Sequence, residues 1–411
     1  MPEFLTLLDP AAALDSLLRQ VPVGPLGTEV LPAAAALGRV VAADVTAVAA
    51  LPGFTRSSVD GYAVNAADTF GVSETLPAYL RLLGEVRMGA APDFRIAKGG
   101  AALIHTGGML PEGADSVVML EYTQLARPDE IEILRPVAAS ENVLLAGEDV
   151  RPGQLLIPRG RILRPAEIGG LMAQGMTAVT LARQPRVVIL SSGDEVVTPD
   201  QEPAPGQVRD INSYSLAALV QKHGGVPVLG GIVPDSAAAL AESLDRFWEE
   251  ADLILVTAGS SASARDFTAQ VIDQLGQPGV LVHGVNVRPG KPTILAVCAG
   301  KPVIGLPGNP VSALVIAELF VAPLLHHLLG RSLPPVAQVP ARLTANLPSQ
   351  AGREEYHPVR LVQQGGETLA EPIYFKSNLI FTLAGADGLV KIPADDTGLA
   401  AGTMVAVRLM L

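Results

Sequence analysis

Between residues 185 and 331 the chain alternates continuous apolar runs with amphipathic stretches. Three runs, RVVIL (186–190), VPVLGGIV (226–233) and LILVTAG (253–259), are typical of strands that are covered on both faces. A stretch with helical periodicity follows each of these runs, at 213–224, 235–250 and 266–276. Three more apolar runs then precede a long apolar helix over 310–330. The pattern predicts a doubly wound α/β domain with a mostly parallel sheet.

Short apolar runs separated by Gly, Pro and Asp dominate two other parts of the chain. Over 77–145 they recur at intervals of about 10–15 residues, which predicts a small β domain with a barrel-like sheet. The same alternation from 332 to 411 predicts a second small β domain at the C-terminal end.

The N-terminal region mixes both patterns. Helical spacing over 8–20 predicts one helix, and Ala-rich spacing over 31–42 predicts a second, which leads into a β-like run over 41–50. Residues 147–176 predict a turn, a strand and a helix. We therefore expect a mixed α/β domain I built from two segments (1–50 and 146–184), an inserted β domain II (51–145), the α/β domain III (185–331) and a C-terminal domain IV (332–411).

Composition and charge exclude several classes of protein. Apolar residues make up 49% of the 411 residues and charged ones 17%, below the roughly 25% typical of soluble domains, which excludes global disorder. The formal net charge is −12 and no run of Lys and Arg is present, so we expect no nucleic-acid partner. A single cysteine, Cys298, and the lack of zinc-type spacing favour a reducing compartment, which predicts a cytoplasmic protein.

Targeting and membrane segments are not expected. The N-terminal stretch carries acidic residues and no basic group, which argues against a secretory signal. The longest apolar stretch, 311–329, is interrupted by Glu318, Pro323 and the pair His326 and His327, so we expect no membrane span.

Residues that follow the predicted parallel strands are the candidates for ligand binding, because ligands bind beyond the carboxyl ends of such strands. Small residues in these loops let backbone N–H groups approach an anion. Arg288 and Lys291, held close together by prolines, suit a phosphate or another oxyanion, and Asp194 and Glu195 beside them favour Mg²⁺. The five loops are 191–195 (SSGDE), 234–236 (PDS), 257–266 (TAGSSASARD), 288–292 (RPGKP) and 305–310 (GLPGNP).

Several of these features also have a purely structural explanation. The Gly-Ser run at 257–261 is compatible with a plain turn. Asn309 and Pro310 have the residue types of a helix N-cap and first helical position, and Asp235 is also placed to cap a helix. His326 and His327 are expected in a solvated or capping role.

Outside the α/β domain the densest local signal is the polar loop PGFTRSSVDGYAV (52–64), whose length and polarity indicate a functional role. It resembles the PxFDNSAMDGYAV motif of the molybdopterin molybdenumtransferase family, MoeA, which includes the C-terminal domain of gephyrin. HTGGMLPEGADSVVMLE (105–121) is similar to the family's MTGAPVPEGADAVVxxE. The motifs GED (147–149), SSGDE, RPGKP and GLPGNPVSA (305–313) also recur in the family's order, so the resemblance covers nearly the whole chain.

The resemblance implies both an architecture and a reaction. The expected architecture is a MogA-like α/β domain with a β-rich inserted domain, a mixed segment-built domain and a C-terminal β-barrel-like domain, usually in a homodimer. The expected reaction inserts molybdenum from molybdate into adenylylated molybdopterin, with Mg²⁺, and releases AMP and molybdenum cofactor. The active site would lie between domain III of one protomer and domain II of the other, and a molybdopterin adenylyltransferase is an expected partner.

The matching motifs carry the family's functional positions onto this sequence. The resemblance assigns catalytic roles to Asp60, Thr106, Lys291 and Asp266. It assigns metal binding to Asp149, Glu195 and Asp235. The substrate-binding positions that it implies are Ser192, Gly193, Asp235, Gly259, Ser260, Ser261, Arg288, Pro307, Gly308, Asn309 and Pro310.

The sequence departs from the family pattern at several places. Thr55 and Arg56 replace Asp and Asn of the first motif, and Arg288 stands where many members have Lys, which keeps the charge and changes its geometry. The run 258–263 (AGSSAS) replaces the family's GGVSxG loop. Residues 144–146 (LLA) stand where well-known members carry arginines, which removes positive charge near domain II.

Two other functions are alternatives at this point. The α/β domain also resembles the molybdopterin adenylyltransferase fold, and an adenylylating enzyme would consume ATP with molybdopterin alone. A gephyrin-like peptide-binding scaffold is the third possibility, although the charged site loops argue against a purely structural role. The sequence does not distinguish molybdate from tungstate as the oxyanion.

Overall fold

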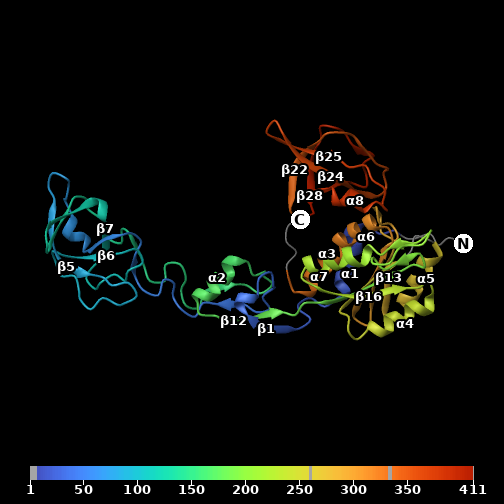
Figure 1. Ribbon diagram of the computed structural model, residues 1–411, viewed down its shortest axis with the longest axis horizontal. Coiled ribbons are helices and arrows are strands. Elements are labelled where there is room, and N and C mark those ends of the chain that lie inside the picture. The colour runs from blue at the N-terminus through green and yellow to red at the C-terminus, as the bar shows by residue number, and fades with distance from the viewer. Residues whose placement is uncertain (1–6, 259–261, 332–335, 411) are drawn as a thin grey trace. The chain divides into compact units, whose positions relative to one another are not determined.

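The computed structural model describes residues 7–258, 262–331 and 336–410, which form two compact units (Figure 1). The larger unit comprises residues 1–43, 159–164 and 179–411, and the smaller unit comprises residues 44–158 and 165–178. The finer division into four domains stays a prediction from the sequence.

A six-stranded sheet forms the centre of the larger unit. The strands lie in the order β16-β13-β17-β21-β20-β18, and β20 runs against the other five because it pairs antiparallel with both β18 and β21. The predicted apolar runs therefore form this sheet. The strands are β13 (Arg186–Ser192), β16 (Val226–Val233), β17 (Leu253–Ala258), β18 (Pro278–His283), β20 (Ile294–Cys298) and β21 (Lys301–Pro307).

Helices cover both faces of the sheet. Their bounds are α1 (Pro10–Gln20), α3 (Asn212–Lys222), α4 (Ala237–Phe247), α5 (Ala262–Asp273), α6 (Pro310–Ile316) and α7 (Ala322–Leu328), with a π-helical turn (Ala317–Val321) that joins α6 to α7. This arrangement confirms the doubly wound α/β prediction.

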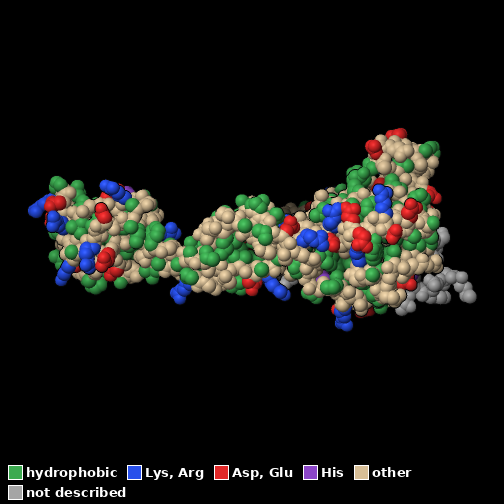
Figure 2. Space-filling model, turned by 90° about the horizontal axis from the view of Figure 1, so that it is seen from below, with side chains coloured by type: hydrophobic (Ala, Val, Ile, Leu, Met, Phe, Trp, Pro, Cys, Tyr) green, Lys and Arg blue, Asp and Glu red, His purple; other side chains and the backbone are tan. Residues whose placement is uncertain are grey.

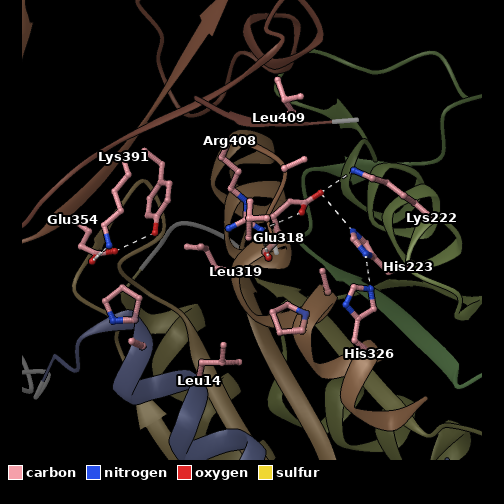
Figure 3. Close-up of a pocket in the computed structure, with 17 residues that line it drawn as sticks. Leu14, Lys222, His223, Glu318, Leu319, His326, Glu354, Lys391, Arg408 and Leu409 are labelled. Atoms are coloured by element: carbon pink, nitrogen blue, oxygen red, sulfur yellow. Dashed lines mark hydrogen bonds and ion pairs between the residues drawn. The ribbon is translucent and has the colours of Figure 1, made fainter. Parts of the chain in front are cut away.

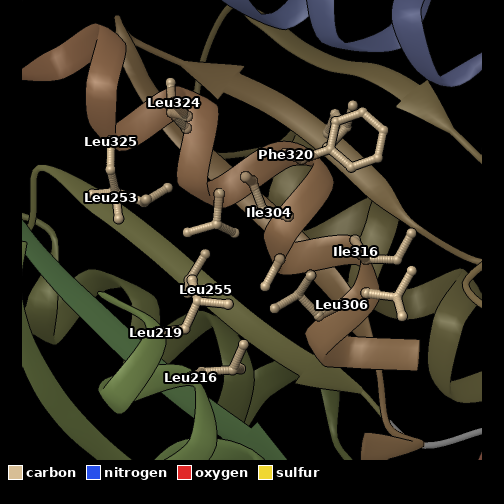
Figure 4. Packing of buried hydrophobic residues seen from close by; sticks show 14 of the residues in the cluster. Leu216, Leu219, Leu253, Leu255, Ile304, Leu306, Ile316, Phe320, Leu324 and Leu325 are labelled. Carbon is tan, nitrogen blue, oxygen red and sulfur yellow. The ribbon is translucent and has the colours of Figure 1, made fainter. Parts of the chain in front are cut away.

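Alternate strand residues face opposite sides of the sheet, so the unit has two separate cores. Val187 and Ile189 pack with α1, α3 and the α6–α7 helix, whereas Val188 and Leu190 pack with α4 and α5. Figure 4 shows the first core, where the α6–α7 helix and α3 lie against the sheet. Phe320 in this core is 0% exposed, so truncation to Ala is expected to cost about 3–5 kcal/mol.

The α6–α7 helix is apolar because it is a core element. The segment Pro310–Leu328 is long and apolar enough to cross a membrane, with a mean hydropathy of 1.8, yet 72% of it is buried inside the protein. His326 was expected in a solvated or capping role, and this prediction is wrong, since the residue is 6% exposed. The neighbouring His327 donates from Nε2 to the carbonyl of Val21 at 2.9 Å.

The C-terminal part of the larger unit is a closed barrel, as the resemblance implied. The barrel strands pair in the circuit β24-β25-β22-β28-β26-β24 around an apolar core. The elements are β22 (Gln338–Leu343), β24 (Glu354–Gln364), β25 (Glu367–Pro372), β26 (Gly388–Ile392), β28 (Met404–Leu409) and α8 (Ile380–Ala384), with the short pair β23 (Leu347–Pro348) and β27 (Gly398–Leu399). A short strand from the α/β part, β19 (Val287–Arg288), pairs in parallel with β24.

The N-terminal region contains one correction. The helix predicted over 8–20 is confirmed as α1, but the helix predicted over 31–42 is wrong. Residues Thr28–Pro32 form strand β1, which pairs with β12 (Ala178–Ala182), and only the 3₁₀ turn Ala33–Ala35 follows. Pairing with a segment far along the chain outweighs the helix propensity of the alanines.

The smaller unit contains another six-stranded sheet, in the order β7-β4-β6-β5-β9-β8. The strands are β4 (Gly61–Val64), β5 (Ala78–Glu85), β6 (Gly100–Ile104), β7 (Ser116–Met119), β8 (Thr123–Arg127) and β9 (Glu130–Ile133). The prediction of a β-rich inserted region is confirmed. The sheet has apolar clusters on both faces and is open rather than barrel-like, because the described edge strands β7 and β8 do not pair with each other.

Short strand pairs and one helix complete the smaller unit. The elements are β2 (Val45–Thr46) with β11 (Leu155–Ile157), β3 (Arg56–Ser57) with β10 (Val143–Leu144), and α2 (Pro165–Ala173). The β-like run predicted over 41–50 is reduced to β2, while β11 and α2 confirm the strand and helix predicted within 147–176. The amide of Gln174 accepts from the N–H groups of Val48 and Ala49 at 2.9 and 3.1 Å, which joins the end of α2 to the first segment of the unit.

Charged side chains are distributed over the surface. On the face in Figure 2, Lys and Arg side chains lie among Asp and Glu side chains, and the described residues of this face show no continuous basic stripe. Any binding of anions therefore depends on local groups within a site.

Candidate functional site

A cavity of about 290 Å³ lies at the carboxyl edge of the central sheet, and three of the five predicted loops contribute to its lining. The ends of β13 and β17, the small parallel pair β14 (Val196–Val197) and β15 (Val208–Arg209), the start of α3 and the loop before α6 form its walls. The lining residues that the sequence predicted are Ser192, Glu195, Gly308, Asn309 and Pro310.

Asn212, which was not predicted from the sequence, also lines the cavity. Its Nδ2 donates to the carbonyl of Gly308 at 2.7 Å, so the amide oxygen must point the other way. That oxygen is buried and has no hydrogen-bond partner among the described residues. A buried acceptor without a partner calls for a donor from a ligand or water. No motif marks this residue, because its role depends on the contact with Gly308.

Asp235 contributes to the site and does not cap a helix. Its Oδ1 accepts from the hydroxyl of Ser192 at 2.8 Å, and its N–H donates to Asp194 at 3.1 Å. The N-cap of α4 is Ser236, whose hydroxyl accepts from the N–H of Ala239 at 3.1 Å. The capping role predicted for Asp235 is therefore wrong, and its half-buried carboxylate lies beside the end of β13.

Asn309 occupies the predicted N-cap position of α6, with Pro310 at the start of the helix. Its side chain does not cap the helix, however, because Nδ2 donates to the hydroxyl of Ser377 at 3.0 Å. Ser377 belongs to the segment before α8, and the following residue, Asn378, lines the same cavity. The C-terminal part of the chain thus supplies a wall of the site, and this contribution was not predicted from the sequence.

The predicted cationic loop lies after β18, at the same sheet edge. Arg288 forms an ion pair with the buried Glu355 of β24 at 3.3 Å, and neither Arg288 nor Lys291 lines the cavity. Lys291 is exposed and has no ion-pair partner among the described residues. Gly290 has a φ of +123°, and a Cβ there would meet Ile316 at 2.4 Å, which explains the glycine in this loop.

Several of the predicted substrate-binding and catalytic residues lie outside the cavity lining or outside the residues that the structure describes. Gly259, Ser260 and Ser261 lie outside the described residues. Asp266 belongs to α5, of which only the backbone is described at this position. Pro307 is the last residue of β21, and Gly193 is buried, where a Cβ would meet the Glu195 carboxylate at 2.8 Å.

In the smaller unit, Thr106 holds the carboxylate of Asp60. The N–H of Thr106 donates to Asp60 Oδ1 at 2.8 Å, and its hydroxyl donates to the same oxygen at 3.2 Å. These bonds, led by the backbone one, lower the pKa of Asp60 below its usual value. His105 lies 3.5 Å from Asp60 through Nδ1 and 3.2 Å from Glu85 through Nε2, so the cluster has one imidazole between two carboxylates.

The strand after Asp60 requires the glycine of the DGYAV motif. A Cβ at Gly61 would lie 2.0 Å from the carbonyl oxygen of Val118 on the paired strand β7. Any larger residue would force β4 and β7 apart and move the Asp60 carboxylate from Thr106. The motif therefore combines a functional side chain with the packing that places it.

Asp149 lines a second cavity in the smaller unit, of about 640 Å³, with Arg56 and Glu148. Arg56 lies directly opposite Leu144 in the antiparallel pair of β3 and β10. Leu144 stands where the resemblance leads us to expect an arginine. Arg56 itself replaces a neutral family residue, so the positive charge missing from one strand is present on the neighbouring strand.

The described residues do not form a complete metal site by themselves. No three of their His, Cys, Asp or Glu side chains are grouped to hold one ion. Mg²⁺ commonly uses one or two carboxylates and completes its shell with water and substrate phosphates. Glu195 and Asp235, on neighbouring loops of the same edge, fit that role together with a phosphorylated substrate.

Comparison with protein families agrees with this arrangement. Residues 8–175 match the MoeA N-terminal region (domain I and II), residues 188–327 a probable molybdopterin binding domain, and residues 340–410 the MoeA C-terminal region (domain IV).

Individual relatives match along most of the chain. The chain is 35% identical to a molybdopterin molybdenumtransferase of a Nostoc species, over 92% of this chain and 88% of the relative. It is 34% identical to molybdopterin molybdenumtransferase 2 of Mycobacterium tuberculosis, over 92% and 94%. The crystal structure of the molybdopterin biosynthesis MoeA protein of Pyrococcus horikoshii matches with a TM-score of 0.86 and 31% identity, over 98% and 100%. The chain therefore belongs to the molybdopterin molybdenumtransferase family, MoeA.

Proposed function

We propose that this chain is a molybdopterin molybdenumtransferase, which inserts molybdenum from molybdate into adenylylated molybdopterin and releases AMP. Relatives of that name match over about nine-tenths of the chain, and the motifs of the family lie at the two sites described above. The proposal places the enzyme in the biosynthesis of the molybdenum cofactor.

The observation that carries the proposal is the unpaired acceptor on the cavity wall. Asn212 presents a buried Oδ1 whose orientation is set by Gly308. A pterin ring carries an amide N–H and an amino group on one edge, and either donor satisfies this oxygen. The free-energy cost of leaving a buried polar group unpaired is larger than the contribution of a typical hydrogen bond. The site therefore selects ligands that pair with this oxygen over ligands that do not.

Charged residues around this edge suit the phosphate part of the substrate. Glu195 and Asp235 would hold Mg²⁺ together with a substrate phosphate, and bound Mg²⁺ offsets negative charge on phosphate oxygens. Lys291, exposed on the loop after β18, would stabilise charge on the departing AMP. Asp266 and the loop 259–261 are proposed to contact substrate on the basis of the resemblance alone.

Asp60 and Thr106 are proposed as the catalytic pair of the smaller unit. The two hydrogen bonds from Thr106 keep the Asp60 carboxylate ionised and fixed in one orientation. Such a carboxylate can hold a proton donor of the substrate or a hydrated cation during the transfer. Asp149 is proposed as a further metal ligand on the basis of the resemblance.

Assembly and location are also proposals. We infer from the family that the protein acts as a homodimer in the cytoplasm and receives its substrate from a molybdopterin adenylyltransferase. Sedimentation velocity on the full chain tests the dimer, because a monomer at micromolar concentration would contradict it.

The site assignment is tested with single variants in a defined assay. Purified protein is mixed with adenylylated molybdopterin, molybdate and Mg²⁺, and AMP release is measured. Lys291→Ala and Asp60→Ala should each lower the rate at least about ten-fold, while Lys98→Ala, at an exposed lysine that lines none of the described cavities, should leave it unchanged. Undiminished rates in both site variants would contradict the assignment.

A further inference from the structure

A third cavity, of about 490 Å³, lies within the larger unit and contains none of the residues proposed for the transfer reaction. Helix α1, the α6–α7 helix and the barrel strands β24, β26 and β28 surround it (Figure 3). Its volume is in the range of cavities that bind small organic molecules. Its walls combine an apolar surface with a cluster of charged side chains and two histidines.

The hydrogen bonds of the two histidines determine where one proton lies. Arg331 can only donate, and its Nη1 lies 3.1 Å from His326 Nε2, so this nitrogen is an acceptor. His223 Nδ1 lies 3.2 Å from the same nitrogen, which has no proton to donate to it. Burial, together with the charge of Arg331, lowers the pKa of His326 to about 4, so the ring is neutral near pH 7. The ring proton of His326 therefore lies on Nδ1.

This N–H group is a buried donor without a partner. His326 is 6% exposed and lines the cavity, and its Nδ1 has no hydrogen-bond partner among the residues that the structure describes. Buried donors are nearly always paired in native structures, so an acceptor from outside the chain is expected at this position.

The charges of the cavity wall favour a negatively charged ligand. Glu318 pairs with Lys222 at 3.1 Å and with Arg408 at 3.6 Å, and Lys391 pairs with Glu354. Burial would raise the pKa of Glu318, but the neighbouring His223, whose Nε2 lies 3.7 Å away, and the charge of Lys222 lower it to about 2. The described lining residues thus carry three positive charges against two negative ones, and one further negative charge would balance them.

The remaining wall is apolar and lies next to this cluster. Ala11 and Leu14 of α1, Leu319 and Pro323 of the long helix, and Leu409 of β28 contribute to it. We propose that the cavity binds a small monocarboxylic acid with an apolar body. One carboxylate oxygen accepts the Nδ1 proton of His326, the carboxylate balances the charge of Lys222 and Arg408, and the body lies against the apolar wall.

Binding of 3-phenylpropanoate to the full-length protein tests this proposal by isothermal titration calorimetry, with neutral 3-phenylpropanamide as the comparison. The acid should bind at least about ten-fold more tightly than the amide, which has the same body and no charge. Lys222→Met should weaken binding of the acid at least about five-fold, whereas Lys98→Met, the same change on the smaller unit, should have no effect.

A second variant distinguishes loss of binding from loss of folding. His326→Phe removes the donor and keeps a ring of similar size, and binding should fall at least about ten-fold in protein whose thermal unfolding remains cooperative. Equal affinity for acid and amide, no saturable binding below about 10 mM, or equal losses in Lys222→Met and Lys98→Met would each overturn the proposal. None of these results bears on AMP release, so the proposed transferase function is tested separately.

Discussion

Thr106 donates two hydrogen bonds to one oxygen of Asp60, from its N–H at 2.8 Å and from its hydroxyl at 3.2 Å. The backbone bond survives any substitution at Thr106 that keeps the loop in place, whereas the hydroxyl bond depends on the side chain. A substitution that removes only the hydroxyl therefore separates the effects of the two hydrogen bonds on the pKa of Asp60.

Thr106→Val removes only the hydroxyl bond and should raise the pKa of Asp60 part of the way to its usual value, because the N–H bond remains. Turnover should fall about ten-fold, and Thr106→Ser should retain most of it. Carboxyl carbon shifts in an NMR titration report the pKa, and AMP release reports turnover. A Val variant with the wild-type pKa and rate would show that the hydroxyl has no role.

Arg56 provides a test of charge relocation in the smaller unit. Because Arg56 faces Leu144 across the β3–β10 pair, an arginine at either position can serve the cavity that Asp149 lines. Arg56→Leu should raise the KM for adenylylated molybdopterin about ten-fold, and adding Leu144→Arg should recover most of the loss. Arg127→Leu, with a side chain 75% exposed, is the control. Failure of the double variant to recover would contradict the relocation.

The amide of Asn212 offers a prediction for the larger unit. Asn212→Ala removes the acceptor proposed for the pterin ring and leaves the Gly308 carbonyl without its donor. The KM for the pterin substrate should rise at least about ten-fold, with a loss of stability of about 1–2 kcal/mol. Ser377→Ala removes the bond to Asn309 but keeps this acceptor, so its effect on KM should be smaller. A larger rise in KM for Ser377→Ala than for Asn212→Ala in steady-state kinetics would contradict the role of Asn212.

Stability should decrease on acidification because of the cluster around His326. Its folded pKa of about 4 is below the ordinary 6.5, so protonation opposes folding. The contribution is complete above pH 6.5 and is lost as the pH falls toward 4, and the loss reaches about 2–3 kcal/mol at pH 4.5. Glu318, with a folded pKa of about 2 against 4.5, loses its contribution in a lower window, between pH 4.5 and 2.

Urea unfolding at a series of pH values separates these two windows. His326→Gln cannot take up the proton, so its stability should depend less on pH between 6.5 and 4.5 than that of the wild type. Glu318→Gln should flatten the dependence only below pH 4.5. Identical slopes in wild type and His326→Gln between pH 6.5 and 4.5 would contradict the assignment of that window to His326.

Much of the fold could be predicted because burial leaves a direct pattern in the sequence. The run at 186–190 and the described part of the run at 253–259, residues 253–258, form strands covered on both faces, since β13 and β17 supply apolar residues to two cores. The helix predicted over 31–42 failed because the sequence does not show that Thr28–Pro32 pairs with Ala178–Ala182. Local propensity does not contain such distant partners.

The candidate site could also be predicted only in part from the sequence. Motifs located Ser192, Glu195 and the GLPGNP loop, because each follows a strand that ends at the same sheet edge. Asn212 and Asn378 were missed, since their place in the cavity depends on contacts with Gly308 and on the segment before α8. The buried position of His326 was missed for a similar reason, because its partners Arg331 and His223 meet it only in the folded chain.

The reaction itself provides the most direct test of the proposed function. The full-length protein is incubated with adenylylated molybdopterin, molybdate and Mg²⁺, and both AMP and active cofactor are quantified, the latter by activation of a cofactor-free molybdenum enzyme. The proposed function predicts that AMP and active cofactor form in equal amounts, and that both require molybdate. If no AMP is released, or if the protein instead consumes ATP with molybdopterin alone, the proposed function is contradicted.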